Sequence, residues 1–260
     1  MLVTGASGLL GRHLQRSDAI DRWELIAPGS GTLDIRTRDR VVDFIHEWKP
    51  DVVVHLAYRK HDRRCIVDGS RNVAEGATAC GARLIHFSTD AVFAGRDAPY
   101  SEADTPVPFS EYGRMKWEAE KAVVAACPPA VIVRTSLMYG TDMLAATQID
   151  VRNALDGGRA MTFYTDEYRC PAHAADVATA IGALAIRRDV TGPVHVAGPE
   201  ALSRAEYARA IATWFGFDAH RLHTGRIADT GVDRPGRVVL DSSLAASLGI
   251  RCRPMAEALR

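Results

Sequence analysis

Three glycines in the spacing G-x-x-G-x-x-G directly follow the first apolar segment of the chain. Residues 1–4 have the pattern of a short buried strand, and residues 9–15 have the pattern of a helix. Between them, Gly5 permits a tight turn, Gly8 lets the backbone approach a pyrophosphate, and Gly11 lets the helix pack closely on the strand. The start of such a helix offers free N–H groups to phosphates. This context predicts a dinucleotide-binding unit, with a purely structural glycine turn as the alternative.

Strand and helix patterns alternate through the first half of the chain. Further strands are expected at residues 23–27, 51–56, 84–87 and 130–134, and helices at 38–48, 72–80 and 111–126. The strands are short and apolar without alternating polar residues, which predicts a parallel sheet with helices on both faces. After Gly140 the alternation loosens, with helices expected at 172–186 and 204–215 and strands at 160–164, 193–196 and 237–240.

These patterns predict an α/β fold, a doubly wound parallel Rossmann sheet with a small mixed C-terminal substrate lobe. We expect residues 1–140 to form the NAD(P)-binding Rossmann domain. Residues 141–260 are expected to complete the sheet and to add a small substrate-binding lobe that is discontinuous in sequence.

The composition excludes several classes of protein. Of the 260 residues, 47% are hydrophobic and 25% are charged, as in ordinary globular proteins. Lys+Arg and Asp+Glu both number 32, so we expect no attraction to nucleic acid or to an anionic membrane. A strand pattern from the first residues leaves no room for a signal peptide, and no apolar run is long enough to span a membrane. Five scattered cysteines without a CxxC pair favour a reduced cytoplasmic protein without disulfides, and we expect no metal site.

Tyr112 and Lys116 stand at positions i and i+4 of an expected helix, and therefore share one helix face. A free phenol titrates near pH 10 and is a poor acid–base group at neutral pH. A nearby ammonium and a nicotinamide cation would favour the phenolate and lower its pKa. Tyr112 is then suited to giving a proton to an alkoxide formed by hydride transfer, and Lys116 to holding the nicotinamide ribose. The alternative is a surface tyrosine and lysine on an amphipathic helix.

Ser88 and Thr89 follow the strand at 84–87, at the carboxyl edge of the expected sheet. Open α/β sheets bind their ligands at this edge. A hydroxyl group there is able to hydrogen-bond and polarise a substrate oxygen. Taken alone, an ordinary polar strand end is the more common explanation.

Several segments together resemble the dTDP-4-dehydrorhamnose reductases, within the extended short-chain dehydrogenase/reductase superfamily. They are FSTDAVFAG at 87–95, YGRMKWEAE at 112–120, VRTSLMYG at 133–140 and the late Arg234-Pro235 pair. In that family a Thr, a Tyr and a Lys form the catalytic set. The resemblance places these roles on Thr89, Tyr112 and Lys116.

The glycine turn and the resemblance together predict the binding residues. The expected cofactor-binding residues are Gly5, Ser7, Gly8, Leu9, Leu10, Gly11, Arg12, Asp34, Ile35, Leu56, Ala57, Tyr58, Ser88, Tyr112, Lys116, Thr135 and Ser136. The expected substrate-binding residues are Thr89, Val92, Phe93, Tyr139, Arg169 and Arg234. Residues 58–61 and 166–171 depart from the family pattern where the substrate should lie, so the resemblance supports the cofactor and the chemistry better than the substrate.

The second expected strand ends in Pro28-Gly29-Ser30, without the acidic residue that usually binds the ribose 2′-hydroxyl of NAD. Arg12 is a candidate partner for the 2′-phosphate of NADP, and a solvated arginine is the alternative. We therefore expect NADP as the preferred cofactor, or NAD.

The resemblance implies an NAD(P)-dependent oxidoreductase that reduces a keto group of a nucleotide-linked deoxysugar. The alternatives are an epimerase of the same superfamily and a non-catalytic dinucleotide-binding regulatory subunit. The expected partner is a small nucleotide-sugar substrate, with no nucleic acid and no membrane, and a homodimer is a possible assembly.

Overall fold

A parallel sheet forms the centre of the computed structural model, which describes residues 1–157, 161–231 and 233–260. In spatial order its strands are β1 (Leu2–Thr4), β2 (Val52–His55), β3 (Arg83–Thr89), β4 (Val131–Thr135) and β9 (Gly192–His195). These strands are buried almost throughout, because both faces of the sheet are covered. The predicted parallel α/β architecture is confirmed.

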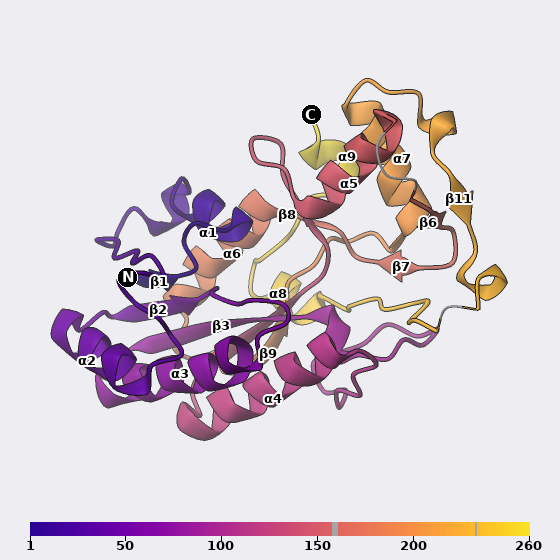
Figure 1. Cartoon of the computed structure of the whole chain (residues 1–260). Helices are drawn as coiled ribbons and strands as arrows, with labels where there is room; N and C mark the ends of the chain where they lie inside the picture. The colour runs from indigo at the N-terminus through magenta and orange to yellow at the C-terminus, as the bar shows by residue number, and fades with distance from the viewer. Residues whose placement is uncertain (158–160, 232) are drawn as a thin grey trace.

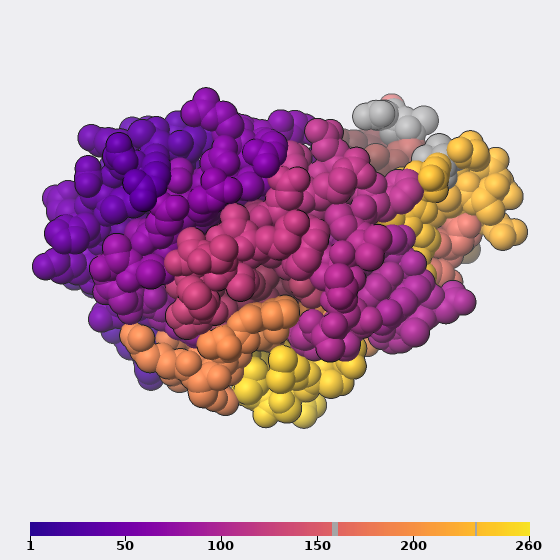
Figure 2. All heavy atoms as spheres, turned by 90° about the horizontal axis from the view of Figure 1, so that it is seen from below, coloured from indigo at the N-terminus to yellow at the C-terminus, as the bar shows by residue number. Residues whose placement is uncertain are grey.

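Helices pack on both faces of this sheet (Figure 1). One face carries α1 (Leu9–Leu14) and α6 (Ala174–Ala185), and the other carries α2 (Arg38–Trp48), α3 (Gly69–Ala79) and α4 (Glu111–Ala126). Successive strand residues point to opposite faces, so Val54 packs in the core under α1 and α6 while Val53 packs under α2 and α3. Seen from below, the N-terminal half of the chain makes up most of the surface, and late segments lie along the lower edge and at the right end (Figure 2).

The strand order reverses at β1. The chain leaves β1, returns beside it at Ile26, and then crosses to the other side of β1 to form β2. A reversal of this kind opens a crevice at the carboxyl ends of the strands, where α/β sheets bind ligands. The sheet therefore has the doubly wound arrangement that the sequence predicts, with its crevice between the ends of β1 and β2.

The strand predicted at 23–27 is wrong in extent, since it is reduced to one bridge between Ile26 and Leu2. The backbone of Ile26 bonds to Met1 and Val3, and the next position but one is Pro28, which has no N–H to continue a ladder. The strand predicted at 237–240 is likewise reduced to single bridges at Arg237 and Leu240.

Other elements agree with the sequence more closely. The bounds predicted for the helices at 38–48 and 111–126 are confirmed, and α7 (Arg204–Trp214) begins with a reciprocal cap between Ser203 and Glu206. Trp48, at the end of α2, is 49% exposed and stacks on Phe44 of the same helix. The strand predicted at 160–164 is present only as β6 (Phe163–Tyr164), and Ala160 lies outside the described residues.

Further short elements gather around a core of their own at the upper right of Figure 1. They include α5 (Ala146–Leu155), α7, α9 (Met255–Ala258), β6 and β11 (Thr224–Gly225). Short pairings connect the rest: β5 (Met138–Tyr139) with β8 (Ala172–His173), and β7 (Tyr168–Arg169) with β10 (Leu202–Ser203). The remaining elements are α8 (Ser243–Ser247), a π-helical turn at Arg64–Asp68 and 3-10 turns at Asp18–Ile20, Asp90–Val92, Ala219–Arg221 and Ile227–Asp229. The division of the chain at residue 140 stays a prediction.

Among the described residues, no helix combines the length and the hydropathy that crossing a membrane requires.

Candidate active site

A cavity of about 620 Å³ opens where the strand order reverses, beside the ends of β1 and β2. Nine of the predicted cofactor residues line it: Gly5, Ser7, Gly8, Arg12, Asp34, Ile35, Leu56, Ala57 and Tyr58. The lining also includes Ser30, Arg36 and Arg59, which the sequence analysis did not assign to the cofactor. The volume lies within the range of ligand pockets for small molecules and cofactors.

The three glycines of the turn have different geometric reasons to be glycine. Gly5 has φ +74°, and a Cβ there would lie 2.6 Å from the backbone nitrogen of Ala57. A Cβ at Gly11 would lie 2.5 Å from Ala6, so this glycine allows the helix to approach the strand. Gly8 has an ordinary extended backbone, and the nearest atom to its Cβ position is 3.4 Å away. Gly5 and Gly11 are therefore required by the fold, whereas a side chain at Gly8 would occupy the cavity that a dinucleotide fits.

Replacing Gly8 with valine should remove most dinucleotide affinity and leave the fold intact. Its backbone angles, φ −72° and ψ 172°, are open to any residue, so the protein should melt near the wild-type temperature. The branched side chain would then fill the space of the pyrophosphate. Titration calorimetry with NADPH measures the loss, and Gly8→Ala should give an intermediate affinity. Equal affinity in wild type and Gly8→Val would locate the dinucleotide elsewhere.

The remaining predicted cofactor residues lie outside the lining of this cavity. Leu9 and Leu10 are the first two residues of α1. The Leu10 side chain is buried in the core, so only its backbone is available to a ligand. The Ser88 hydroxyl donates to the Glu120 carboxylate at 2.5 Å, so this side chain is already bonded within the protein, and the assignment of Ser88 to the cofactor stays a prediction. Neighbouring residues of a strand point to opposite faces of the sheet. Ser88 faces α4, and Thr89 therefore faces away from it.

Tyr112 and Lys116 lie in the first two turns of α4. The Ser110 side chain caps this helix by accepting from Gly113 N, and the helix then brings both residues onto one face. The buried Lys116 ammonium donates to the backbone oxygen of Phe87 on β3 at 2.5 Å. Tyr112 lies beside Tyr58 of the cavity, with 6.2 Å between ring centroids.

Gly113 explains how closely α4 approaches the strand end. A Cβ at this position would overlap the carbonyl oxygen of Ala91, two residues after Thr89. Only a glycine lets the first turn of α4, and hence Tyr112, pack directly against this segment. Gly113 is not among the predicted site residues, and its place in the YGRMK segment is the signal that points to it.

The electrostatics of this pair differ from expectation. Burial raises the pKa of Tyr112 above its ordinary value, and the neighbouring Tyr58 and Asp90 raise it further. Burial also lowers the pKa of Lys116 to about 8. In the protein alone the Tyr112 pKa is therefore raised, with desolvation of the phenolate as the largest cause. The lowering expected beside a bound nicotinamide cation stays a prediction.

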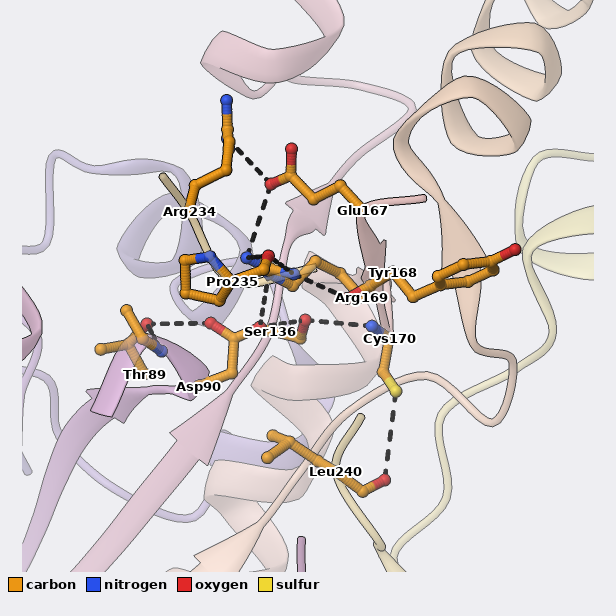
Figure 3. Close-up of polar contacts among 11 residues, drawn as sticks. Thr89, Asp90, Ser136, Glu167, Tyr168, Arg169, Cys170, Arg234, Pro235 and Leu240 are labelled. Atoms are coloured by element: carbon orange, nitrogen blue, oxygen red, sulfur yellow. Dashed lines mark hydrogen bonds and ion pairs between the residues drawn. The ribbon is translucent and has the colours of Figure 1, made fainter. Parts of the chain in front are cut away.

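Thr89 and Ser136 meet at a carboxylate that the sequence analysis missed (Figure 3). Thr89 Oγ1 donates to Asp90 Oδ1 at 3.2 Å, and Ser136 Oγ donates to Asp90 Oδ2 at 2.6 Å. Thr135, the last residue of β4, is paired in register with Thr89 of β3. The buried Thr135 hydroxyl has no hydrogen-bond partner among the described residues. The position of Asp90 next to Thr89 was the signal for it.

The two predicted substrate arginines share one buried glutamate. Arg234 Nη2 lies 2.9 Å from Glu167 Oε1, and Arg169 Nη2 lies 3.4 Å from the same oxygen. Arg169 also bonds to the carbonyl oxygens of Tyr168 and Pro235, which leaves it largely committed to the protein. Arg234 is 39% exposed and is the more accessible of the two.

Val92, Phe93 and Tyr139, which are predicted to contact the substrate, are all buried in the structure, and these contacts stay predictions. Val92 and Phe93 are buried in a core where Phe93 stacks on Tyr100, with centroids 4.1 Å apart. Tyr139 is fully buried and packs edge-on against Tyr207. Apolar and aromatic residues that follow a strand become part of the hydrophobic core when neighbouring segments of the chain cover them.

The far end of the cavity combines one carboxylate with several arginines. Asp34 accepts from Arg36 through both oxygens, and this pairing lowers the Asp34 pKa to about 2. Arg36 also reaches Asp62 at 3.2 Å. Arg12 is exposed, and among the described residues its one hydrogen bond runs from Nε to Ser7 O. Arg12 therefore has unused donors at the cavity wall, and Arg36 has few.

A family model described as the RmlD substrate binding domain matches residues 1–260. Methionine adenosyltransferase 2 subunit beta of Pongo abelii is 31% identical over 277 residues, which cover 96% of this chain and 82% of that protein. A dTDP-4-dehydrorhamnose reductase of Mycolicibacterium smegmatis is 31% identical over 275 residues, with 96% and 80% covered.

Among solved structures, the dTDP-4-dehydrorhamnose reductase from Bacillus anthracis str. Ames in complex with NADP superposes with a TM-score of 0.88. The sequence identity is 25%, and the match covers 99% of this chain and 96% of that one. The resemblance inferred from the sequence is thereby confirmed. Since the family model spans the chain from end to end, this protein belongs to the RmlD substrate binding domain family.

Proposed function

We propose that this protein is an NAD(P)-dependent oxidoreductase that reduces a keto group of a nucleotide-linked deoxysugar, with Tyr112 as the general acid. The observation that carries the proposal is that Lys116 of α4 bonds to Phe87 O on β3, two residues before Thr89, while Tyr112 of the same helix lies beside Tyr58 of the glycine-lined cavity. The relatives that are named dTDP-4-dehydrorhamnose reductases support the substrate class.

The chain's own residues fit a reduction. The dinucleotide, when bound, supplies the hydride. The raised pKa of Tyr112 keeps the phenol protonated at neutral pH, which suits a group that must give a proton to the new alkoxide. Lys116 donates its ammonium to Phe87 O, two residues before the end of β3, and its proposed role is to hold the nicotinamide ribose.

The proposal is tested by following NADPH oxidation with a panel of dTDP- and UDP-linked keto sugars. Turnover of at least one of them, abolished by removing the Tyr112 hydroxyl, supports the proposed activity. Binding of dinucleotide without any turnover would contradict it.

A non-catalytic dinucleotide-binding subunit is the second candidate. It is favoured by the 31% identity to methionine adenosyltransferase 2 subunit beta, which equals the identity to the reductase. The two candidates differ in what Tyr112 does, because a binding subunit has no use for an acid at the cavity. An epimerase of the same superfamily stays the enzymatic alternative. The cytoplasmic location, the homodimer and the individual site residues stay predictions from the sequence.

Cofactor choice gives a separate prediction. Arg12 has free donors at the cavity wall, and a charge-assisted hydrogen bond to a 2′-phosphate contributes about 1.5–3 kcal/mol. We therefore expect NADPH to bind roughly 10- to 100-fold more tightly than NADH. Arg12→Ala should abolish this preference, and Arg16→Ala, an exposed arginine just beyond the same helix, should keep it. Competitive titration of NADPH and NADH measures this preference. Tighter binding of NADH by wild type would refute the assignment of Arg12 to the 2′-phosphate.

A further inference from the structure

Tyr58 lies where the dinucleotide cavity meets the reacting groups. Leu56, Ala57 and Tyr58 line the cavity just after β2, and the centroid of the Tyr58 ring lies 6.2 Å from that of the Tyr112 ring. Among the described residues that line this cavity, Tyr58 is the one aromatic side chain. A ligand that extends from the cavity toward Tyr112 therefore passes along the Tyr58 ring.

The Tyr58 ring is accessible to such a ligand. It is 55% exposed, whereas Tyr112 beside it is partly buried. Within the described part of the chain, no lysine or arginine lies over the Tyr58 ring. An arginine does lie over the rings of Tyr100, Tyr164, Tyr168 and Tyr207. The electron-rich face of Tyr58 is therefore available to a cation that the protein does not itself supply.

The proposed reaction brings the nicotinamide ring close to Tyr112. In a reduction the hydride adds to the carbonyl carbon, and Tyr112 gives its proton to the oxygen of the same carbonyl group. Reacting atoms have to come within about 3–3.5 Å of each other. The hydride donor and the phenol are thus separated by little more than one carbonyl group. The nicotinamide ring then lies at the Tyr112 end of the cavity, which is where Tyr58 is.

The two redox states of the dinucleotide differ in charge at this ring. The nicotinamide ring of NADP⁺ carries a positive charge, and that of NADPH is neutral. A cation over the face of an aromatic side chain is attracted by the ring quadrupole, and the attraction strengthens when the pair is shielded from water. A neutral ring in the same place gains only the apolar contact. An aromatic side chain at this position therefore discriminates between the two redox states.

We propose that Tyr58 adds affinity for the oxidised dinucleotide over the reduced one, so that NADP⁺ formed in one turnover delays the binding of the next NADPH. The inference rests on the proposed reductase function, which locates the nicotinamide ring, and it adds regulation by the ratio of NADP⁺ to NADPH. Residues 58–61 form a segment in which the sequence departs from the reductase family. The selectivity is accordingly assigned to this chain and not to the family.

The test measures the dissociation constants of NADP⁺ and NADPH by titration calorimetry, without any sugar. Tyr58→Leu keeps an apolar side chain but removes the aromatic face. The ratio of the Kd of NADP⁺ to the Kd of NADPH should therefore rise by about 3- to 30-fold in this variant. The charges of Lys116 and Asp90 act on the nicotinamide ring in wild type and variant alike, so they cancel when the two ratios are compared.

Two control variants isolate the cause. Tyr58→Phe keeps the aromatic face and should keep the wild-type ratio within about twofold. Trp48→Leu removes an exposed aromatic side chain that does not line the cavity, and it should change neither dissociation constant. A ratio that rises in Tyr58→Phe as it does in Tyr58→Leu would assign the effect to the hydroxyl group and overturn the proposal.

The remaining outcomes separate this inference from the proposed function. Equal losses of affinity for NADP⁺ and NADPH in Tyr58→Leu would show an apolar contact alone, and unchanged constants would locate the nicotinamide ring away from Tyr58. Either result overturns the selectivity, whether or not keto sugars react. The expected rise in the ratio, combined with no turnover of any keto sugar, would refute the reductase activity and support the role of Tyr58.

Discussion

Tyr112→Phe is expected to lower turnover by a factor of about 100 or more, the scale for losing a general acid. The change removes one oxygen and little volume, so the fold and the dinucleotide cavity should persist. The pKa of Tyr112 is raised, so the wild-type phenol should stay protonated through neutral and mildly alkaline pH. Initial rates of NADPH oxidation, with NADPH affinity measured in parallel, separate the loss of the acid from any loss of binding.

Tyr100→Phe is the matched control for this experiment. Tyr100 is a buried tyrosine that stacks on Phe93, and no role in the site is assigned to it. Its variant should keep wild-type turnover within about twofold, as for a change away from the reacting groups. A Tyr112→Phe protein with wild-type turnover would contradict the proposed role of Tyr112 as general acid.

Lys116→Met is expected to lose most of the turnover and to remove a pH dependence of stability. Lys116 has a pKa of about 8 in the folded protein, against 10.5 for an unburied lysine. Between these values the unfolded chain binds more protons than the folded chain, so this group makes folding more favourable as pH rises. The wild type should therefore gain about 2 kcal/mol of unfolding free energy relative to Lys116→Met between pH 8 and pH 10.

Denaturant titrations at a series of pH values measure this difference. The compared quantity is the slope of the unfolding free energy against pH. Lys116→Met also removes the hydrogen bond to Phe87 O, but that loss does not depend on pH and leaves the slope unchanged. Lys121→Met, an exposed lysine on the same helix, should follow the wild type. Parallel pH profiles for wild type and Lys116→Met would contradict the burial of a charged Lys116.

Much of the fold follows from local patterns. The spacing of Gly5 and Gly11 could be read without coordinates, because each meets a local requirement for a turn or for close helix packing. The bounds of α2 and α4 agree with the sequence, since apolar spacing and a capping residue such as Ser110 act within a few residues. The pairing of Tyr112 with Lys116 is local for the same reason, as one helical turn joins them.

Features that depend on contacts between distant segments could not be predicted from the sequence. The strand around Ile26 formed only one bridge, because its length depends on what lies at the sheet edge. Val92 and Tyr139 resembled substrate contacts but lie in cores that distant segments complete. Their burial is decided by which parts of the chain come to cover them.

The sequence by itself determined the dinucleotide-type turn, the α/β alternation and the tyrosine–lysine pair, because each depends on contacts within a few residues. Only the tertiary structure decided what these groups are able to do. It brought the Asp90 carboxylate within hydrogen-bond distance of the hydroxyls of both Thr89 and Ser136. It also buried Lys116 fully and Tyr112 in part, and desolvation moved their pKa values in opposite directions. Hydrogen-bond direction and desolvation are set by neighbours that are remote in sequence, so no local pattern contains them.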